Sequence, residues 1–161
     1  MGTFANASSA NDFMTGRKQL RTPQGAEVVT ERFTISLGTG DLDASDIGAF
    51  AKLPAGCIPV DAIVDATDMD SSTAALVLTF GVMTTADASA LSVESADGGG
   101  AWGATTASNA AFTQRLTFTG NNMMNVAVDR DTDRLVGCIV TTAPTTAVAG
   151  TLGLTLSYRN A

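Results

Sequence analysis

Apolar side chains recur at every second position in several stretches of the chain, and this alternation constrains the fold more than any other feature. The clearest examples are residues 32–37, 74–84 and 148–158. A period of two is the side-chain period of a β-strand that buries one face. The apolar sets are Phe33, Ile35 and Leu37, then Leu76, Leu78, Phe80 and Val82, and finally Val148, Leu152, Leu154, Leu156 and Tyr158. In the last stretch the opposite face is small and polar, with Thr151, Gly153, Thr155 and Ser157.

Four further strands are predicted, at 58–65, 112–119, 123–129 and 135–142. Pro59 has no N–H donor, so the first of these is expected at a sheet edge or to begin at the proline. Its two faces are expected to carry Ile58, Val60, Ala62 and Val64 on one side and Asp61 and Asp65 on the other.

The whole pattern predicts an all-β chain. Only residues 41–53 offer a short helix, and Gly48 weakens that prediction. Seven or eight strands without a convincing helix indicate an antiparallel β-sandwich, with a jelly roll as the favoured topology. Residues 1–27 are small and polar and show no periodicity. We therefore expect a flexible N-terminal arm over 1–27 and a β-sandwich domain over 28–161.

Charge is distributed unevenly between these two parts. Residues 1–25 contain Arg17, Lys18 and Arg21 against Asp12, a net charge of +2. Because the whole chain has a net charge of −7, the remaining residues together carry −9. An acidic body repels a phosphate backbone, and nucleic-acid binding is not expected. The N-terminus lacks the apolar segment of a signal peptide, and no apolar run is long enough to span a membrane. The chain is therefore expected to be made in the cytoplasm and to have no membrane partner.

The residues of common active sites are missing from the sequence. The chain has no histidine, which excludes Ser-His-Asp and Cys-His arrangements and most zinc sites. The glycine run at 98–100 lacks the lysine of a phosphate loop and is expected to be a flexible loop. Cys57 and Cys138 lie in apolar stretches, where they are expected to act as small buried hydrophobes, although a disulfide between neighbouring strands stays open. No enzyme and no cofactor are predicted.

Two aspartate clusters raise the question of calcium. Alternating carboxylates in loops can hold Ca²⁺, but an EF-hand that began at Asp65 would need Gly and Glu where Asp70 and Leu76 stand. The clusters are therefore interpreted as solvated turns, with no metal site. They consist of Asp41, Asp43 and Asp46, and of Asp65, Asp68 and Asp70.

Residues 130–134 are interpreted as a charged hairpin tip. Glycoside hydrolysis by paired carboxylates is disfavoured, because one Trp and one Tyr give little aromatic surface for a sugar.

Two segments of the chain resemble head decoration (cement) proteins of tailed bacteriophages. They are LPAGCIPVDAIVDATDMDSSTAALVLTFGV at 53–82 and AGTLGLTLSYRNA at 149–161. The resemblance covers about residues 28–158 and rests on the order and composition of these segments. It implies a β-sandwich that binds the major capsid protein on the outer surface of an assembled capsid, after synthesis in the host cytoplasm. It also implies a homo-oligomer, with a homotrimer favoured and a dimer as the alternative.

Two alternatives to a decoration protein stay open. One is another virion component, either a head fibre base or a tail protein, and the other is a carbohydrate-binding host-attachment module. In the decoration hypothesis the arm contacts the capsid through Phe4, Phe13, Arg17, Lys18, Leu20 and Arg21. The alternative for these residues is an unstructured, solubilising tail. Met83, Met123 and Met124 are possible oligomer contacts, although methionine more often fills gaps in a core.

Overall fold

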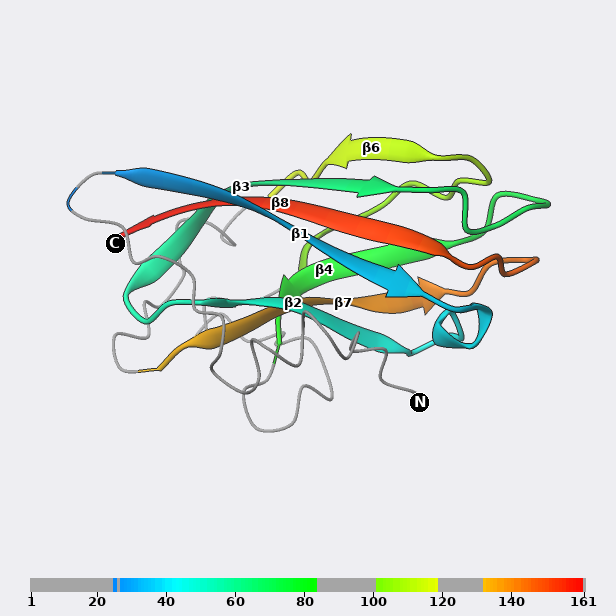
Figure 1. The fold of residues 1–161 in the computed structure, drawn as a ribbon, viewed down its shortest axis with the longest axis horizontal. Helices are drawn as coiled ribbons and strands as arrows, with labels where there is room; N and C mark the ends of the chain where they lie inside the picture. The colour runs from blue at the N-terminus through cyan, green and yellow to red at the C-terminus, as the bar shows by residue number, and fades with distance from the viewer. Residues whose placement is uncertain (1–24, 26, 84–100, 119–131, 161) are drawn as a thin grey trace.

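The computed structural model describes residues 25, 27–83, 101–118 and 132–160, and these residues form two stacked layers of strands (Figure 1). In chain order the elements are β1 (Val28–Leu37), the 3-10 turn η1 (Thr39–Asp41), β2 (Ile47–Leu53), β3 (Cys57–Ala66), β4 (Val77–Val82), β5 (Ala101–Ala104), β6 (Phe112–Arg115), β7 (Arg134–Thr142) and β8 (Gly150–Asn160).

The strand order identifies the topology. One sheet has the order β1-β8-β3-β6 and the other β2-β7-β4-β5, and every pairing is antiparallel. Among the described strands, the chain crosses from one sheet to the other at every connection except β4 to β5. Eight strands in two four-stranded sheets with this order form a jelly roll. The predicted antiparallel sandwich is confirmed.

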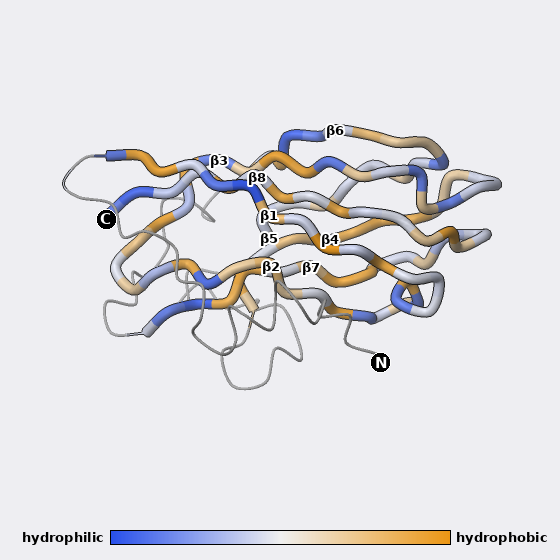
Figure 2. The backbone as a smooth tube through the Cα atoms, in the orientation of Figure 1, coloured by the Kyte–Doolittle hydropathy of each residue, from blue (hydrophilic) through white to orange (hydrophobic). Residues whose placement is uncertain are grey.

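β8 lies in the interior of its sheet, and its alternating sequence gives it one buried face. β8 pairs with β1 on one side and with β3 on the other along most of its length. Its apolar face is wholly buried in the core, with Leu152, Leu154, Leu156 and Tyr158. Figure 2 shows the same alternation of hydropathy along the strands. The prediction for this stretch is confirmed, except that Val148 lies before the strand and is exposed.

The facing sheet supplies the other half of the core. The predicted apolar face of β4 is buried, and the Phe80 ring lies 6.0 Å from the Phe50 ring of β2. Trp102 of β5 is also buried, with its ring centre 5.6 Å from that of Phe118. Both sheets thus contribute large side chains to one continuous core.

The predicted faces of β3 are wrong before Asp61. The pairing of β3 with β8 shifts register between Pro59 and Asp61, which marks a bulge. Because one extra residue reverses the alternation, Cys57 and Pro59 are buried ahead of the bulge, while Ile58 and Val60 are only partly buried. Beyond it the prediction holds, with Ala62 and Val64 in the core.

β3 lies between β8 and β6 in its sheet, but at Pro59 it pairs with β8 alone, so the edge alternative holds locally. The other alternative is confirmed, since the proline lies near the beginning of β3. The pairing with β6 starts only at Ile63, so no ladder hydrogen bond from β6 is lost at the proline.

The short helix considered for 41–53 is also wrong. Residues Thr39–Asp41 form a single 3-10 turn, and Ile47–Leu53 form strand β2 against β7. Ser45 has a φ of 76°, and the Asp46 carboxylate accepts a hydrogen bond from the Asp43 N–H at 3.1 Å, so the chain turns sharply just before the strand. No helix in the described part of the chain is long and apolar enough to cross a membrane.

Both cysteines are buried and free, as the small-hydrophobe interpretation predicts. Burial raises the pKa of the Cys138 thiol to about 12. Burial also raises the pKa of Cys57, although the nearby Arg134 guanidinium opposes the effect. Neither environment favours a thiolate nucleophile.

A second, smaller apolar cluster involves β2 and β7. It contains Ile47, Ala49, Met83 and Leu135. Gly137 is essential to it, because a Cβ at this position would overlap the Gly48 carbonyl oxygen and the Met83 sulfur. The glycine therefore allows β2 and Met83 to approach β7 closely.

The carboxylate of Asp70 joins two loops of the sandwich. Asp70 is fully buried, and its two oxygens accept hydrogen bonds from the backbone N–H groups of Ala75, Leu76, Thr145 and Thr146 at 3.0–3.4 Å. Burial raises the pKa of this carboxyl, but the four donors lower it by more, so the pKa lies below its usual value. The loop after β3 is thereby fixed to the loop before β8.

Gly137→Ala is expected to lower the free energy of unfolding by about 1–3 kcal/mol or more, because the added methyl would overlap the Gly48 carbonyl oxygen, and this backbone atom cannot move aside as the Met83 side chain can. Urea denaturation followed by tryptophan fluorescence measures this change. Gly40→Ala is the matched control, since a Cβ there meets nothing within 4 Å. Equal stability of the two variants would contradict the packing described for Gly137.

Asp70→Asn is expected to lower the melting temperature at pH 7, because the amide replaces one carboxylate acceptor with a donor facing backbone N–H groups. The folded-state pKa of Asp70 is lowered, so its contribution is fully present above the unfolded value of about 4 and is lost as the pH falls through the lowered pKa. The melting temperatures of wild type and variant should therefore converge well below pH 4.

The control for this measurement is Asp43→Asn, at an exposed loop position. Its melting curve should follow that of the wild type at every pH. A constant gap between wild type and Asp70→Asn down to acid pH would contradict the role assigned to the ionised carboxylate.

Candidate functional site

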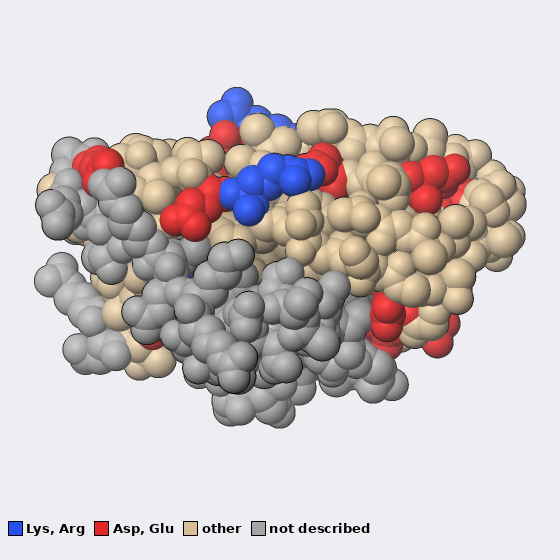
Figure 3. Space-filling view, viewed as in Figure 1, with Lys and Arg blue, Asp and Glu red and all other residues tan. Residues whose placement is uncertain are grey.

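The outward face of the β1-β8-β3-β6 sheet is polar and carries the candidate site. The alternation of β8 places Thr151, Gly153, Thr155 and Ser157 on this face, opposite to the buried leucines. In register, Asp65 of β3 lies beside Gly153, and Arg32 of β1 lies beside Thr155. Figure 3 shows basic side chains next to acidic ones on the visible described surface.

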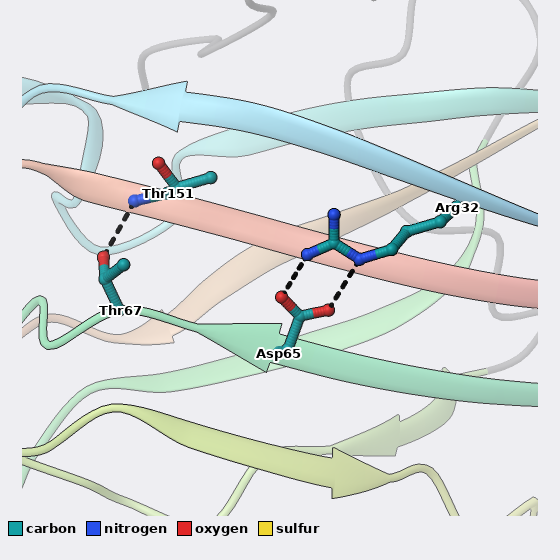
Figure 4. Close-up of polar contacts among 4 residues, drawn as sticks. All are labelled: Arg32, Asp65, Thr67 and Thr151. Carbon is teal, nitrogen blue, oxygen red and sulfur yellow. Dashed lines mark hydrogen bonds and ion pairs between the residues drawn. The ribbon is translucent and has the colours of Figure 1, made fainter.

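An ion pair crosses β8 at this point. The Arg32 guanidinium donates from Nε to Asp65 Oδ1 at 3.3 Å and from Nη2 to Oδ2 at 2.5 Å (Figure 4). The two side chains are 52% and 33% exposed, so the pair remains accessible to solvent. A Cβ on Gly153 would lie 2.6 Å from Asp65 Oδ1 and 2.8 Å from Arg32 Nη2. The glycine thus leaves the space in which the pair lies.

The pair forms one side of a groove of about 420 Å³. The groove is lined by Arg32, Asp65, Ala66, Thr67, Ala111, Phe112, Thr113 and Thr151. Thr67 Oγ1 accepts a hydrogen bond from the Thr151 N–H at 2.9 Å, which fixes the end of the groove (Figure 4). The lining therefore combines one balanced charge pair, three hydroxyl-bearing residues and one partly buried aromatic ring.

A second ion pair lies on the same strand, outside the groove. Arg115 of β6 donates from Nε and Nη2 to the two oxygens of Asp61, each at 2.7 Å. Hydrogen bonding to Arg115 holds the pKa of Asp61 below its usual value. Asp61 and Asp65 point outward, as the sequence predicts, and each has an arginine partner from a different strand.

The residues predicted to contact a capsid lie outside the described residues, and their role stays a prediction. They are Phe4, Phe13, Arg17, Lys18, Leu20 and Arg21, together with Met123 and Met124 of the predicted oligomer contact. Met83 is described, is 1% exposed, and packs in the small cluster beside Gly137.

The aspartate clusters have structural roles that their spacing does not reveal. Asp65 pairs with Arg32, Asp68 accepts a hydrogen bond from the Asp70 N–H, and Asp70 binds loop backbone. No three acidic or cysteine side chains gather as a metal site within the described ranges.

The interpretation of 130–134 as a charged hairpin tip is wrong at Arg134, the first residue of β7. Arg134 is buried, and its guanidinium donates to the Cys57 carbonyl oxygen at 2.5 Å. Next to it, Asp133 is exposed and accepts a hydrogen bond from the Ala55 N–H at 3.0 Å. Both residues therefore fasten β7 to the chain around the start of β3.

Two phage capsids are among the solved structures that are similar to this chain. The chain is similar to a chain in the structure of the capsid of Ralstonia phage GP4, with a TM-score of 0.76 and 25% sequence identity over 99% of each chain. It is also similar to a chain of the cyanophage Pam1 capsid asymmetric unit, with a TM-score of 0.54 and 14% identity over 91% of this chain and 96% of that one. The second similarity shows a shared fold alone.

No family model matches the sequence, and no curated protein matches it.

Proposed function

We propose that this chain is a virion structural protein that binds the outer surface of an assembled phage capsid and stabilises it. One observation carries the proposal: nearly the whole chain matches nearly the whole of a chain in the Ralstonia phage GP4 capsid, at a TM-score of 0.76. Because the match extends over both chains from end to end, it concerns the whole molecule and not one shared motif. The sequence resemblance to decoration proteins supports the same role.

The chemistry of the described residues is consistent with binding. The chain has no histidine, both cysteines are buried, and the outward acidic groups Asp61 and Asp65 are each paired with an arginine. These features favour a binding role over a catalytic one, and the capsid contact itself is assigned to the arm. The partner proposed is the major capsid protein, and the chain would act as a homotrimer or, as the alternative, a dimer.

The proposed mechanism is stabilisation by mass action. A protein that binds the assembled shell, and binds free subunits less well, lowers the free energy of the shell. Repetition over many symmetric sites adds modest contacts into a large total, and an oligomer that spans neighbouring subunits gains further from effective concentration. The arm would contribute contacts that order only on the capsid.

The first test is the location and copy number of the chain in purified particles of the phage that encodes it. We expect a copy number comparable to that of the capsid subunits by quantitative mass spectrometry, and density for the jelly roll on the outside of the shell by cryo-electron microscopy. A few copies per particle, or density confined to the tail or to the base of a fibre, would contradict the decoration role and favour those alternatives.

The second test concerns the arm. Removing residues 1–25 is expected to reduce binding to particles that lack the protein, measured by co-sedimentation, while the thermal melt of the β domain stays unchanged. A full-length variant with Arg17, Lys18 and Arg21 changed to Gln separates charge from length, and it should weaken binding less than the deletion does. Full occupancy by the truncated chain would refute the role of the arm.

A further inference from the structure

We propose that the groove over β8, between Arg32 and Phe112, is a binding site for a neutral saccharide. This site is separate from the proposed capsid contact, which the sequence assigns to the arm. The inference rests on four properties of the groove: its charge balance, its hydroxyl groups, its aromatic ring and its size.

The charge balance argues for a neutral ligand. Arg32 and Asp65 are held together by two hydrogen bonds, so the pair has no net charge. An anion that approached the guanidinium would be repelled by the carboxylate beside it. A cation that approached the carboxylate would likewise be repelled by the guanidinium. A ligand that carries both donors and acceptors but no charge avoids either repulsion. Adjacent hydroxyl groups of a sugar have this property.

Hydrogen-bonding capacity remains on both members of the pair. A guanidinium has five N–H donors, and only those on Nε and Nη2 of Arg32 are directed at Asp65. The carboxylate oxygens have further lone pairs, and each side chain is partly exposed on the groove side. Side-by-side donor and acceptor groups of this kind can bind two neighbouring sugar hydroxyls, one as acceptor and one as donor.

The remaining lining adds hydroxyls and a ring. Thr67, directly after β3, and Thr113 of β6 are both exposed at the groove. Phe112 is only partly buried, so part of its ring can contact the apolar C–H face of a sugar. The volume of about 420 Å³ lies within the range of about 300–1,000 Å³ typical of small-ligand sites.

The experiment uses the purified full-length chain on an array of immobilised glycans, both neutral and acidic. We expect binding to neutral glycans. The neutral glycan with the strongest signal is then titrated into ¹⁵N-labelled protein, where amide shifts should map to Thr67, Thr113 and Thr151. No binding to any neutral glycan, binding confined to acidic glycans, or shifts that map elsewhere would each overturn the proposal.

Variants then test the site itself. Asp65→Ala is expected to weaken binding at least about tenfold, because it removes an acceptor and frees the arginine charge. Asp61→Ala is the matched control: it breaks an equivalent ion pair on the same strand, outside the groove, and should leave affinity unchanged. Equal weakening by the two variants would refute the assignment.

Thr113→Val provides a second variant, which should not destabilise the domain because Thr113 is exposed and valine has nearly the same shape as threonine. It should weaken binding several-fold with an unchanged thermal melt. If Asp65→Ala fails to fold, this variant decides the outcome, and unchanged affinity would count against the proposal. Neither result bears on capsid binding, so the two proposals succeed or fail separately.

Discussion

The two faces of β8 determine both the core and the outer surface of this jelly roll. β8 pairs on both sides, and its leucines and Tyr158 form the centre of one layer of the core. The residues between them are small, and this is what allows side chains from β1 and β3 to meet above the strand. Gly153 is the decisive position, because any side chain there would displace the Arg32–Asp65 pair. Core and groove are therefore two consequences of one alternating sequence.

The sequence predicts the fold well where alternation is regular and less well where local geometry interrupts it. β4 and β8 follow their pattern, and the predicted jelly roll is confirmed. The bulge after Pro59 reverses the faces of β3, and a bulge leaves no mark in a hydropathy pattern until the partner strand is known. β2 is buried on both faces and shows no alternation, so its strand character depends on pairing with β7, which joins residues far apart in sequence.

The groove is harder to predict than the fold. Arg32 and Asp65 are neighbours only because β1 and β3 flank the same strand, and neither residue belongs to a recognisable motif. The one available signal is a glycine in the middle of an otherwise regular strand, which indicates close approach of other atoms. Spacing was misleading for the aspartates as well. Asp65 and Asp70 are close in sequence, yet one pairs with an arginine on the surface and the other binds backbone in the interior.

The described strands form a two-layered sandwich around one continuous core, with paired charges on the outward face of one sheet. The proposed function requires that binding to the assembled shell stabilises that shell. The most direct measurement is the melting temperature of capsids that lack this protein, followed calorimetrically before and after saturation with the purified chain. We expect the shell transition to move to higher temperature as occupancy rises. An unchanged transition at full occupancy would contradict the proposed function.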